Sequence, residues 1–477
     1  MAITMATVII GAGAGGLSAA IALAARGERV TVLESQAGAG GKMLPVQLGD
    51  NRFDSGPTVL TMRWVFDELF QLSGDDLDAD LDLQPLHCLA RHYWTGGATL
   101  DLFANQQHSI DAIGRFAGKA EAEGYQAFAK ASRLVHQSLL LPFLKSQRPT
   151  PWGLSAAMPL RDLLRINPFE SYWHALGRYF KDPRLLQLFG RYATYCGSSP
   201  FTAPATLMLI ADVEACGVWR VTGGMANLAK ALELQARRLG VAFHFDCAAE
   251  RIETSGSRIT AVIDQNATRH VCRSVIVNAD SAAVATGLFG HSVSQAAAKP
   301  ADKDRSLSAI TWCATTREAG VPLDHHNVFF SDDYEAEFAQ LKHGPAIDPT
   351  AYICDQDRGR KLILVNAPAN IQAAPTDMTE RMLERLAKSG LTLSLENQPM
   401  LQRSPKDFAA LYPATSGALY GRASNGWMST FLRPQARTKI PHLYLAGGST
   451  HPGPGVPMAA LAGMRAAEAL LQDQALT

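Results

Sequence analysis

The first segment of the chain alternates apolar stretches and glycines in the order strand, turn, helix, strand. Residues 6–10 form a short apolar stretch without turn signals, which predicts a buried parallel strand. Residues 17–25 are strong helix formers, and Gly27 stands where such a helix would end. A second apolar stretch, 29–33, predicts another strand, and Glu34 follows it directly. This order is typical of a βαβ unit in an α/β domain.

The turn between the first strand and the helix is rich in glycine. Gly11 permits a tight turn, Gly13 lets the backbone approach a pyrophosphate, and Gly16 lets the helix pack closely on the strand. The free N–H groups and the positive end of the helix dipole favour phosphates here. Glu34 follows at nearly the spacing expected of an acid that binds ribose hydroxyls. An ordinary flexible loop is the alternative, but so many glycines beside a helix would be costly. We therefore predict a dinucleotide site that includes Gly15.

The same periodicities extend along the rest of the chain and predict a nucleotide domain assembled from separated pieces. Helices are predicted at 61–72, 117–144, 228–239, 379–386 and 459–471, and strands at 241–245, 258–263, 273–280, 361–366 and 442–448. The predicted division is 1–90, 219–290 and 431–477 for the nucleotide domain, 91–218 for a helical region facing substrate or membrane, and 291–430 for a substrate domain.

A second turn, rich in glycine and proline, precedes the last predicted helix. Residues 449–457 contain three prolines and two glycines. Such a stiff turn lets a flat ring lie against the backbone, and the helix dipole can stabilise negative charge on a reduced isoalloxazine. A simple proline-rich loop is the alternative explanation.

Composition restricts the classes of function. At 477 residues the chain is longer than a single core usually supports. Basic and acidic residues both number 44, so the net charge is zero and no footprint for nucleic acid is present. The seven cysteines are scattered without a C-x-x-C pair, which favours a reducing compartment and argues against a disulfide framework or a metal site. The uncharged segment 6–25 is interrupted by its glycines, so no membrane-spanning helix is predicted.

With these motifs in place, the chain resembles the phytoene desaturase group of flavin-dependent carotenoid desaturases over essentially its full length. The matching motifs are Gly11–Gly16 with Glu34, then 40–43, 54–59, 179–184, 199–205, 217–219 with 223–224, and 450–458. The last motif is specific to these enzymes rather than to flavoproteins in general. Residues 56–70 and 219–221 look most like the branch that introduces the 3,4 double bond into 1-hydroxylated or 1-methoxylated carotenoids.

The resemblance implies FAD as the cofactor and an architecture like that of flavin amine oxidases: a Rossmann-type FAD domain interrupted by a mixed α+β substrate domain and a helical region. Gly41, Lys42 and Met43 would lie on the phosphate side of the flavin. Ala249 or Glu250 would pass the adenine. The residues implied along the ring are Gly448, Gly455, Val456, Pro457 and Met458.

The implied reaction transfers a hydride from an allylic CH₂ to flavin N5 and removes a proton from the neighbouring carbon. Asp212 and Glu214 lie in an apolar helical stretch and are candidates to accept the proton or contact a hydroxyl, with surface or capping carboxylates as the alternative. Arg63 and Arg220 are candidates to contact the oxygenated end of the substrate, or are structural. His451, beside the flavin turn, is a candidate for acid–base work or for structural placement.

A carotenoid must be drawn from a membrane, so we expect a peripheral protein at the inner, cytoplasmic face of a bacterial-type membrane. Residues 139–144 and 152–154 are the candidate monotopic surface, with buried core as the alternative. Oxygen or a quinone is the expected electron acceptor. A phytoene desaturase that acts on the unsubstituted carotene, a flavin amine oxidase, and a non-catalytic prenyl-binding escort of the same fold remain alternative functions.

Overall fold

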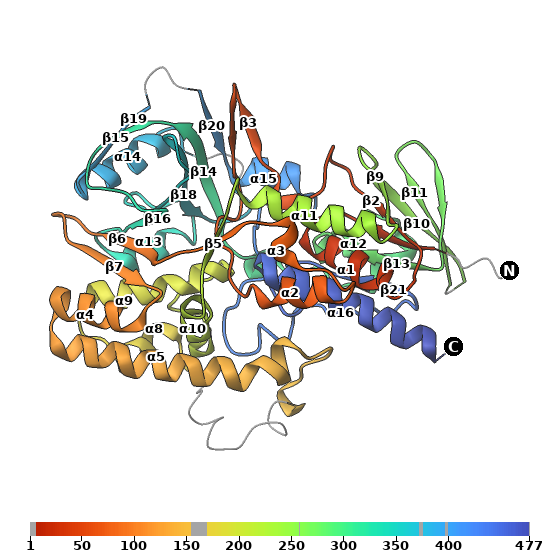
Figure 1. The fold of residues 1–477 in the computed structure, drawn as a ribbon, viewed down its shortest axis with the longest axis horizontal. Helices are drawn as coiled ribbons and strands as arrows, with labels where there is room; N and C mark the ends of the chain where they lie inside the picture. Colours follow the sequence, from red (N-terminus) through yellow and green to blue (C-terminus); the bar gives the residue numbers. More distant parts are fainter. Residues whose placement is uncertain (1–5, 154–168, 257, 372–374, 396–398, 477) are drawn as a thin grey trace.

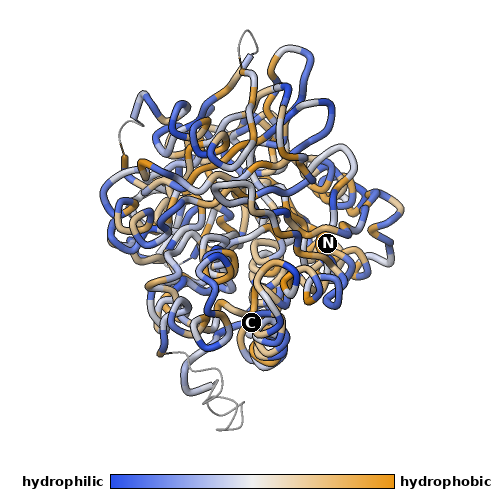
Figure 2. The backbone as a smooth tube through the Cα atoms, turned by 90° about the vertical axis from the view of Figure 1, so that its left-hand side faces the viewer, coloured by the Kyte–Doolittle hydropathy of each residue, from blue (hydrophilic) through white to orange (hydrophobic). Residues whose placement is uncertain are grey.

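The computed structural model describes residues 6–153, 169–256, 258–371, 375–395 and 399–476. Figure 1 shows a region built around a parallel sheet at the end that carries both termini, a second sheet at the opposite end, and a layer of helices below that second sheet. Figure 2 shows that apolar segments run through the middle of the molecule, whereas the loops at its upper edge are largely hydrophilic. The predicted α/β class with an added α+β region is confirmed.

The first sheet has five parallel strands in the order β21-β13-β1-β2-β9. Its strands come from three separated parts of the chain, as the sequence predicted for the nucleotide domain. Parallel strands buried on both faces need apolar side chains throughout, and β1 and β13 are fully buried. The strands are β1 (Thr7–Ile10), β2 (Val30–Leu33), β9 (Ala242–His244), β13 (Ser274–Val277) and β21 (Leu443–Leu445).

Helix α1 (Ala14–Ala24) packs against α16 (Val456–Ala475), so the two ends of the chain lie side by side (Figure 1). The contact is close because both helices present glycine to it. A Cβ atom added at Gly463 would lie 1.9 Å from the Gly15 carbonyl oxygen. Helix α11 (Met225–Arg238) also packs on α1. The first and the last helix of the chain are therefore neighbours in the fold.

The second sheet has seven strands in the order β20-β14-β18-β17-β16-β6-β7, and only β16 and β6 pair in parallel. One face packs on α14 (Met378–Lys388), and the other faces the helical layer. The predicted domain boundary after residue 90 falls inside β6. The strands are β6 (Cys88–Tyr93), β7 (Thr99–Phe103), β14 (Ser308–Thr315), β16 (His326–Phe329), β17 (Ala351–Asp355), β18 (Arg360–Ala367) and β20 (Met400–Arg403).

The helix predicted at 117–144 is recovered as the helix Lys119–Leu139, and the prediction misses its start by two residues. Gly118, with a φ of 98°, separates it from the preceding helix Gln106–Ala117. A short π-helical turn, η2 (Leu140–Leu144), then ends the second of them. The layer comprises α4 (Gln106–Ala117), α5 (Lys119–Leu139), α8 (Tyr172–Leu176), α9 (Pro183–Gly190), η3 (Arg191–Cys196), η4 (Ala205–Met208) and α10 (Leu209–Ala215).

Smaller elements connect these layers. In the described residues, no helix combines the length and the apolar character that crossing a bilayer requires. The connecting elements are η1 (Gly41–Met43), β3 (Val46–Leu48), β4 (Asn51–Phe53), α2 (Trp64–Gln71), α3 (Leu77–Asp80), β5 (Leu83–Pro85), β8 (Trp219–Val221), β10 (Ala249–Ser255), β11 (Arg258–Asp264), β12 (Arg269–Val271), α12 (Ser281–Ala285), η5 (His291–Ala296), η6 (Asp302–Asp304), β15 (Arg317–Gly320), α13 (Tyr334–Gln340), β19 (Leu391–Ser394) and α15 (Pro405–Leu411).

Candidate functional site

The glycine turn between β1 and α1 has the geometry of a phosphate cradle. Gly11 adopts a φ of 97°, which favours glycine, and its N–H donates to the Leu33 carbonyl oxygen at 2.7 Å. A Cβ atom at Gly16 would lie 2.0 Å from the Gly11 carbonyl oxygen, so no larger residue fits there without moving the turn. Gly13 lies directly before α1, at its N-terminus. The turn therefore leaves backbone N–H groups free of side-chain cover at a helix N-terminus.

Glu34 reaches across from the end of β2 to this turn. Its carboxylate accepts the Ala12 N–H at 2.6 Å and the Gln36 N–H at 2.9 Å, and the side chain is buried. Two backbone donors hold the carboxylate beside the turn, and carboxylate oxygens keep further lone pairs for hydroxyl donors. Ala249 begins β10 shortly after Cys247, whose N–H donates to the Glu34 carbonyl oxygen at 2.8 Å. The predicted adenine-side segment therefore adjoins the predicted ribose acid.

The loop that carries Lys42 folds back over the glycine turn. A bridge joins Gly13 to Gly40, and a Cβ atom at Gly41 would lie 3.2 Å from Gly13 Cα. Lys42 donates to the Leu419 carbonyl oxygen, and Met43 is buried. Burial lowers the pKa of Lys42 to about 8, although the negative charge of Asp280 opposes the shift. A buried cation beside a phosphate cradle suits an anionic partner.

The C-terminal turn presents a second helix N-terminus on the same side of the sheet. Gly455 has a φ of 113° and precedes α16, with Val456 and Pro457 in the first turn of the helix and Met458 following them. Gly448 lies against the backbone of the turn, where a Cβ atom would come 3.6 Å from Pro454 Cα. The predicted ring-side residues are therefore brought together at one helix start.

Asn278 connects the two turns and was not among the sequence candidates. It follows β13, and its Nδ2 donates to the Gly11 carbonyl oxygen at 3.2 Å. A Cβ atom at Gly447 would lie 2.8 Å from its Oδ1, and one at Gly15 would lie 2.6 Å from the same atom. The sequence signal for Asn278 is a polar residue directly after a buried strand. Its role also requires the order of the strands in the sheet, which the sequence did not supply.

The class of protein follows from three features: the parallel sheet, the two glycine turns before α1 and α16, and the ribose-type acid Glu34. Together they define a flavin-dependent oxidoreductase with an interrupted nucleotide domain. The chain belongs to the flavin containing amine oxidoreductase family, which matches residues 14–471. The cofactor is FAD. The glycines fit it, because an added Cβ would fill the cradle, and Glu34 and Lys42 supply the acid and the cation that the ribose and diphosphate require.

Comparison with individual proteins gives relatives of two kinds. The chain is 44% identical to a hydroxyneurosporene desaturase of Rubrivivax gelatinosus over 98% of this chain and 93% of that protein. It is 41% identical to a hydroxyneurosporene desaturase of Rhodobacter capsulatus, over 98% of each. A solved structure of putrescine oxidase bound to putrescine has a TM-score of 0.61 and covers 98% of this chain and 99% of that one. Its identity is 15%, so this likeness is one of fold alone.

Both carboxylate candidates of α10 are buried, so the alternative of surface carboxylates is wrong. Asp212 accepts from His136 Nδ1 at 2.9 Å. Burial lowers the pKa of His136, but the hydrogen bonds and charges of Asp212 and Cys216 together outweigh burial and raise that pKa to about 9. Glu214 accepts hydrogen bonds from the hydroxyls of Tyr192 and Tyr195, the latter at 2.8 Å. Asp212 is thus paired with a cation, whereas Glu214 is held by neutral donors.

The two arginine candidates are engaged in ion pairs. Arg63 donates to Asp67 at 3.2 Å and to Asp78 at 2.6 Å, which joins α2 to α3. Arg220 pairs with Asp357 at the rim of a small cleft. Residues that line this cleft include Asp54, Thr58, Gly224, His325, Cys354 and Arg360. Of the two, only Arg220 adjoins a described cleft.

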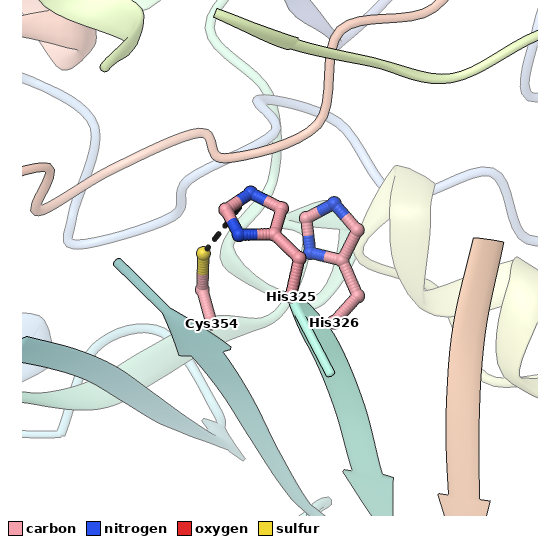
Figure 3. A group of neighbouring side chains, drawn as sticks. All are labelled: His325, His326 and Cys354. Atoms are coloured by element: carbon pink, nitrogen blue, oxygen red, sulfur yellow. Dashed lines mark hydrogen bonds between the residues drawn. The ribbon is translucent and has the colours of Figure 1, made fainter. Parts of the chain in front are cut away.

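His325 and Cys354 line this cleft, and His326 lies next to His325, where Figure 3 shows the two imidazole rings side by side. Cys354 Sγ lies 3.8 Å from His325 Nε2, and in the described residues the trio is one of three groups with the spacing of metal ligands. Burial, followed by the negative charges of Asp54 and Asp355, raises the pKa of Cys354. Without a bound metal ion, its sulfur is therefore held as a thiol.

His451 is committed to the contact between the flavin turn and the helical layer. Its Nε2 lies 2.9 Å from the Phe143 carbonyl oxygen, and its ring meets that of Phe143 edge to face. Burial lowers the pKa of His451 to about 4, so the ring is neutral at pH 7. Neutral imidazole donates through one nitrogen only, so Nε2–H is the donor to Phe143. These contacts favour the structural placement of His451.

Proposed function

We propose that this chain is an FAD-dependent carotenoid desaturase that introduces the 3,4 double bond into a 1-hydroxy- or 1-methoxycarotenoid. The observation that carries the proposal is the identity of 44% to a hydroxyneurosporene desaturase over nearly the whole chain, together with the intact cofactor turns. The amine oxidase alternative rests on the broad family match and on a likeness of fold at 15% identity. The escort alternative requires a degraded cofactor site, and the residues that form the cradle are all present.

When bound, FAD supplies a two-electron acceptor for the hydride that leaves an allylic carbon. The chain's own contribution is to orient the substrate and exclude water. The interface between the second sheet and the helical layer suits this task, because it is lined mainly by apolar and aromatic side chains. Those with the least exposure include Leu176, Phe180, Phe189, Tyr192, Val328 and Phe330.

The substrate class is tested with the purified, FAD-loaded protein. Liposomes that contain neurosporene, 1-hydroxyneurosporene or its 1-methoxy derivative are incubated with the enzyme, and the products are separated by chromatography with absorbance detection. We expect a bathochromic shift from one added conjugated double bond with the oxygenated substrates. Turnover of phytoene instead would favour the phytoene desaturase alternative. Bound flavin without turnover of any polyene would contradict the proposal.

We also propose that the helical layer touches the membrane surface, at the cytoplasmic face. Part of the predicted segment is buried, since Leu139, Phe143 and Leu144 pack in the core of the helical layer. Leu141 is 69% exposed and Trp152 is 85% exposed. Leu154 lies outside the described residues. Exposed large apolar side chains on a substrate-facing layer suit interfacial binding to lipid.

Replacing Trp152 by serine is expected to weaken liposome binding by about tenfold, because an indole contributes roughly 1 to 2 kcal/mol at an interface. Binding is measured by flotation with vesicles of mixed anionic and zwitterionic lipid. Val271→Ser is the matched control, since Val271 is also exposed but lies on β12, away from the helical layer. Equal flotation of wild type and Trp152→Ser would remove this face from the proposal.

The electron acceptor is proposed to be oxygen or a membrane quinone. An anaerobic assay with and without a quinone in the vesicles separates the two. Turnover that continues without oxygen only when quinone is added assigns the quinone, and turnover that requires oxygen in both cases assigns oxygen. Turnover with neither acceptor would exclude both.

FAD affinity is expected to fall as the pH rises above about 8. The free protein loses the Lys42 proton near that pH, whereas the diphosphate of bound FAD raises the pKa and retains the proton. Above pH 8, binding must therefore take up a proton, and affinity falls by at most about tenfold per pH unit. Dissociation constants from flavin fluorescence between pH 7 and 10 test this. Lys42→Met should bind more weakly, with a flat profile; a flat profile in the wild type would contradict the role of Lys42.

A further inference from the structure

The face of the second sheet that meets the helical layer is apolar except for a few polar side chains. Strands β6 and β16 pair in parallel with Val328 opposite His92, and β17 pairs with Val328 through Tyr352. Residues in register point to the same face, and so do residues two apart on one strand. His92, His326 and Tyr352 therefore share the face that carries Val328, toward the helical layer.

Arg191 begins η3 on the opposite side of this interface and is buried. In the described part of the chain it makes no ion pair with a carboxylate. Its guanidinium donates to the Tyr195 hydroxyl at 3.1 Å, and that hydroxyl donates to Glu214 at 2.8 Å. The Tyr195 hydroxyl therefore bridges Arg191 and Glu214. The guanidinium has further N–H donors that this hydrogen bond does not use.

Three buried polar atoms at this interface have no hydrogen-bond partner among the described residues: Arg191 Nε, His92 Nε2 and His326 Nε2. Burial, and then the nearby charge of Arg191, lowers the pKa of His92 to about 3. Burial, followed by His325 and then Arg191, lowers the pKa of His326 well below its usual value. Both rings are thus neutral. His92 Nδ1 lies 3.1 Å from the Leu100 carbonyl oxygen, which fixes the proton on Nδ1 and leaves Nε2 as an acceptor.

Buried polar atoms are costly when unpaired, so a set of them in an apolar interface indicates a ligand with matching chemistry. One donor and one acceptor suit an alcohol, which accepts from the guanidinium and donates to a neutral imidazole. A carboxylate or phosphate would instead place an oxygen lone pair against the lone pair of His92 Nε2, which is unfavourable. An entirely apolar ligand would leave all three atoms unpaired.

The same cluster is connected to the Lys42 loop on two sides. The Tyr352 hydroxyl lies 2.7 Å from Thr58 Oγ1 and 2.7 Å from His326 Nδ1. Thr58 follows Gly56, where a Cβ atom would lie 2.0 Å from the Lys42 carbonyl oxygen. On the other side, η3 ends at Gly197, which packs on Tyr420, next to the residue that accepts from Lys42. A group bound here therefore lies on the cofactor side of the interface.

We propose that Arg191 and His92 bind the oxygenated end group of the substrate, with Arg191 donating to its oxygen and His92 accepting from a hydroxyl. This inference rests on the proposed function and names the side chains that select its substrate. The oxygen in a 1-hydroxycarotenoid is only a few bonds from the 3,4 position. Holding that oxygen close to the Lys42 loop would therefore fix the position of the reacting carbons.

The two side chains make different demands, which allows a discriminating test. A 1-methoxy oxygen accepts but cannot donate, so it uses Arg191 only. We expect Arg191→Met to lower kcat/KM by about 10- to 100-fold for both the 1-hydroxy and the 1-methoxy substrate. His92→Leu should lower it by a similar factor for the 1-hydroxy substrate and leave the 1-methoxy substrate within about twofold. Arg191→Lys, which keeps a cationic donor, should recover part of the loss.

Arg178→Met is the control, because Arg178 carries the same side chain in the same layer but lies at the surface. Flavin absorbance and thermal unfolding verify that each variant is folded and loaded. Wild-type selectivity that survives in both Arg191→Met and His92→Leu would overturn the inference while the proposed function stands. A wild type that turns over no oxygenated carotenoid would instead contradict the proposed function itself. If Arg191→Met fails to fold, His92→Leu alone decides, through its ratio between the two oxygenated substrates.

Discussion

Gly16→Ala is expected to lower FAD affinity by about 10- to 100-fold, since overpacking a rigid contact costs roughly 1 to 3 kcal/mol. The added methyl group would lie 2.0 Å from the Gly11 carbonyl oxygen, which is backbone and cannot rotate away. Relief requires the turn to open, and this displaces the N–H groups that face the phosphates. The measurement is the flavin content of the purified variant together with the dissociation constant from fluorescence titration.

Gly344→Ala is the matched control for this substitution. Its added Cβ would meet nothing within 4 Å, and its backbone is not in the left-handed region. It should retain FAD at the affinity of the wild type. If Gly16→Ala bound FAD as tightly as Gly344→Ala, the turn could not be the phosphate cradle.

Gly463→Ala is expected to destabilise the junction of the two chain ends, lowering the free energy of unfolding by about 1 to 3 kcal/mol. The new methyl group would lie 1.9 Å from the Gly15 carbonyl oxygen and 3.0 Å from the Ala19 nitrogen, so α1 and α16 must separate. Because these helices begin at the two cofactor turns, FAD affinity should fall together with stability. Urea unfolding followed by circular dichroism, with and without added FAD, measures both effects.

Ala475→Ser serves as the control on α16, because residue 475 is exposed near the end of the same helix. It should unfold at the same urea concentration as the wild type. A Gly463→Ala variant with unchanged unfolding and unchanged FAD affinity would show that the close contact of α1 and α16 is not required to assemble the site.

The cofactor turns could be predicted from sequence because their signals are local. Gly11, Gly13 and Gly16 are constrained by backbone geometry within one turn, and Glu34 follows its strand at a fixed spacing. The strand at 6–10 and the helix at 459–471 were likewise found within a few residues of their observed bounds, Thr7–Ile10 and Val456–Ala475. The hydrophobic pattern within such a short segment shows which of its faces is buried, without any information from distant residues.

Local signals failed where long-range contacts decide. The predicted domain boundary after residue 90 falls inside β6, because only the pairing of β6 with β16 shows that Cys88–Tyr93 belongs to the second sheet. Glu214 was considered as a surface carboxylate because nothing near it in the sequence supplies the hydroxyls of Tyr192 and Tyr195. Burying a charged side chain costs much free energy unless it has such hydrogen-bond partners, and the fold determines which partners lie near it.

The sequence by itself determined the cofactor, the βαβ unit, the second turn and the resemblance to carotenoid desaturases. Only the tertiary structure decided that Asn278 joins the two turns, and that unpaired atoms of Arg191 and His92 are both buried at one apolar interface. The physical reason is separation along the chain: Gly11 and Asn278 directly follow adjacent strands but lie far apart in sequence. Periodicity and turn chemistry report what a segment does alone, whereas unpaired buried donors and acceptors become visible only once distant segments are packed together.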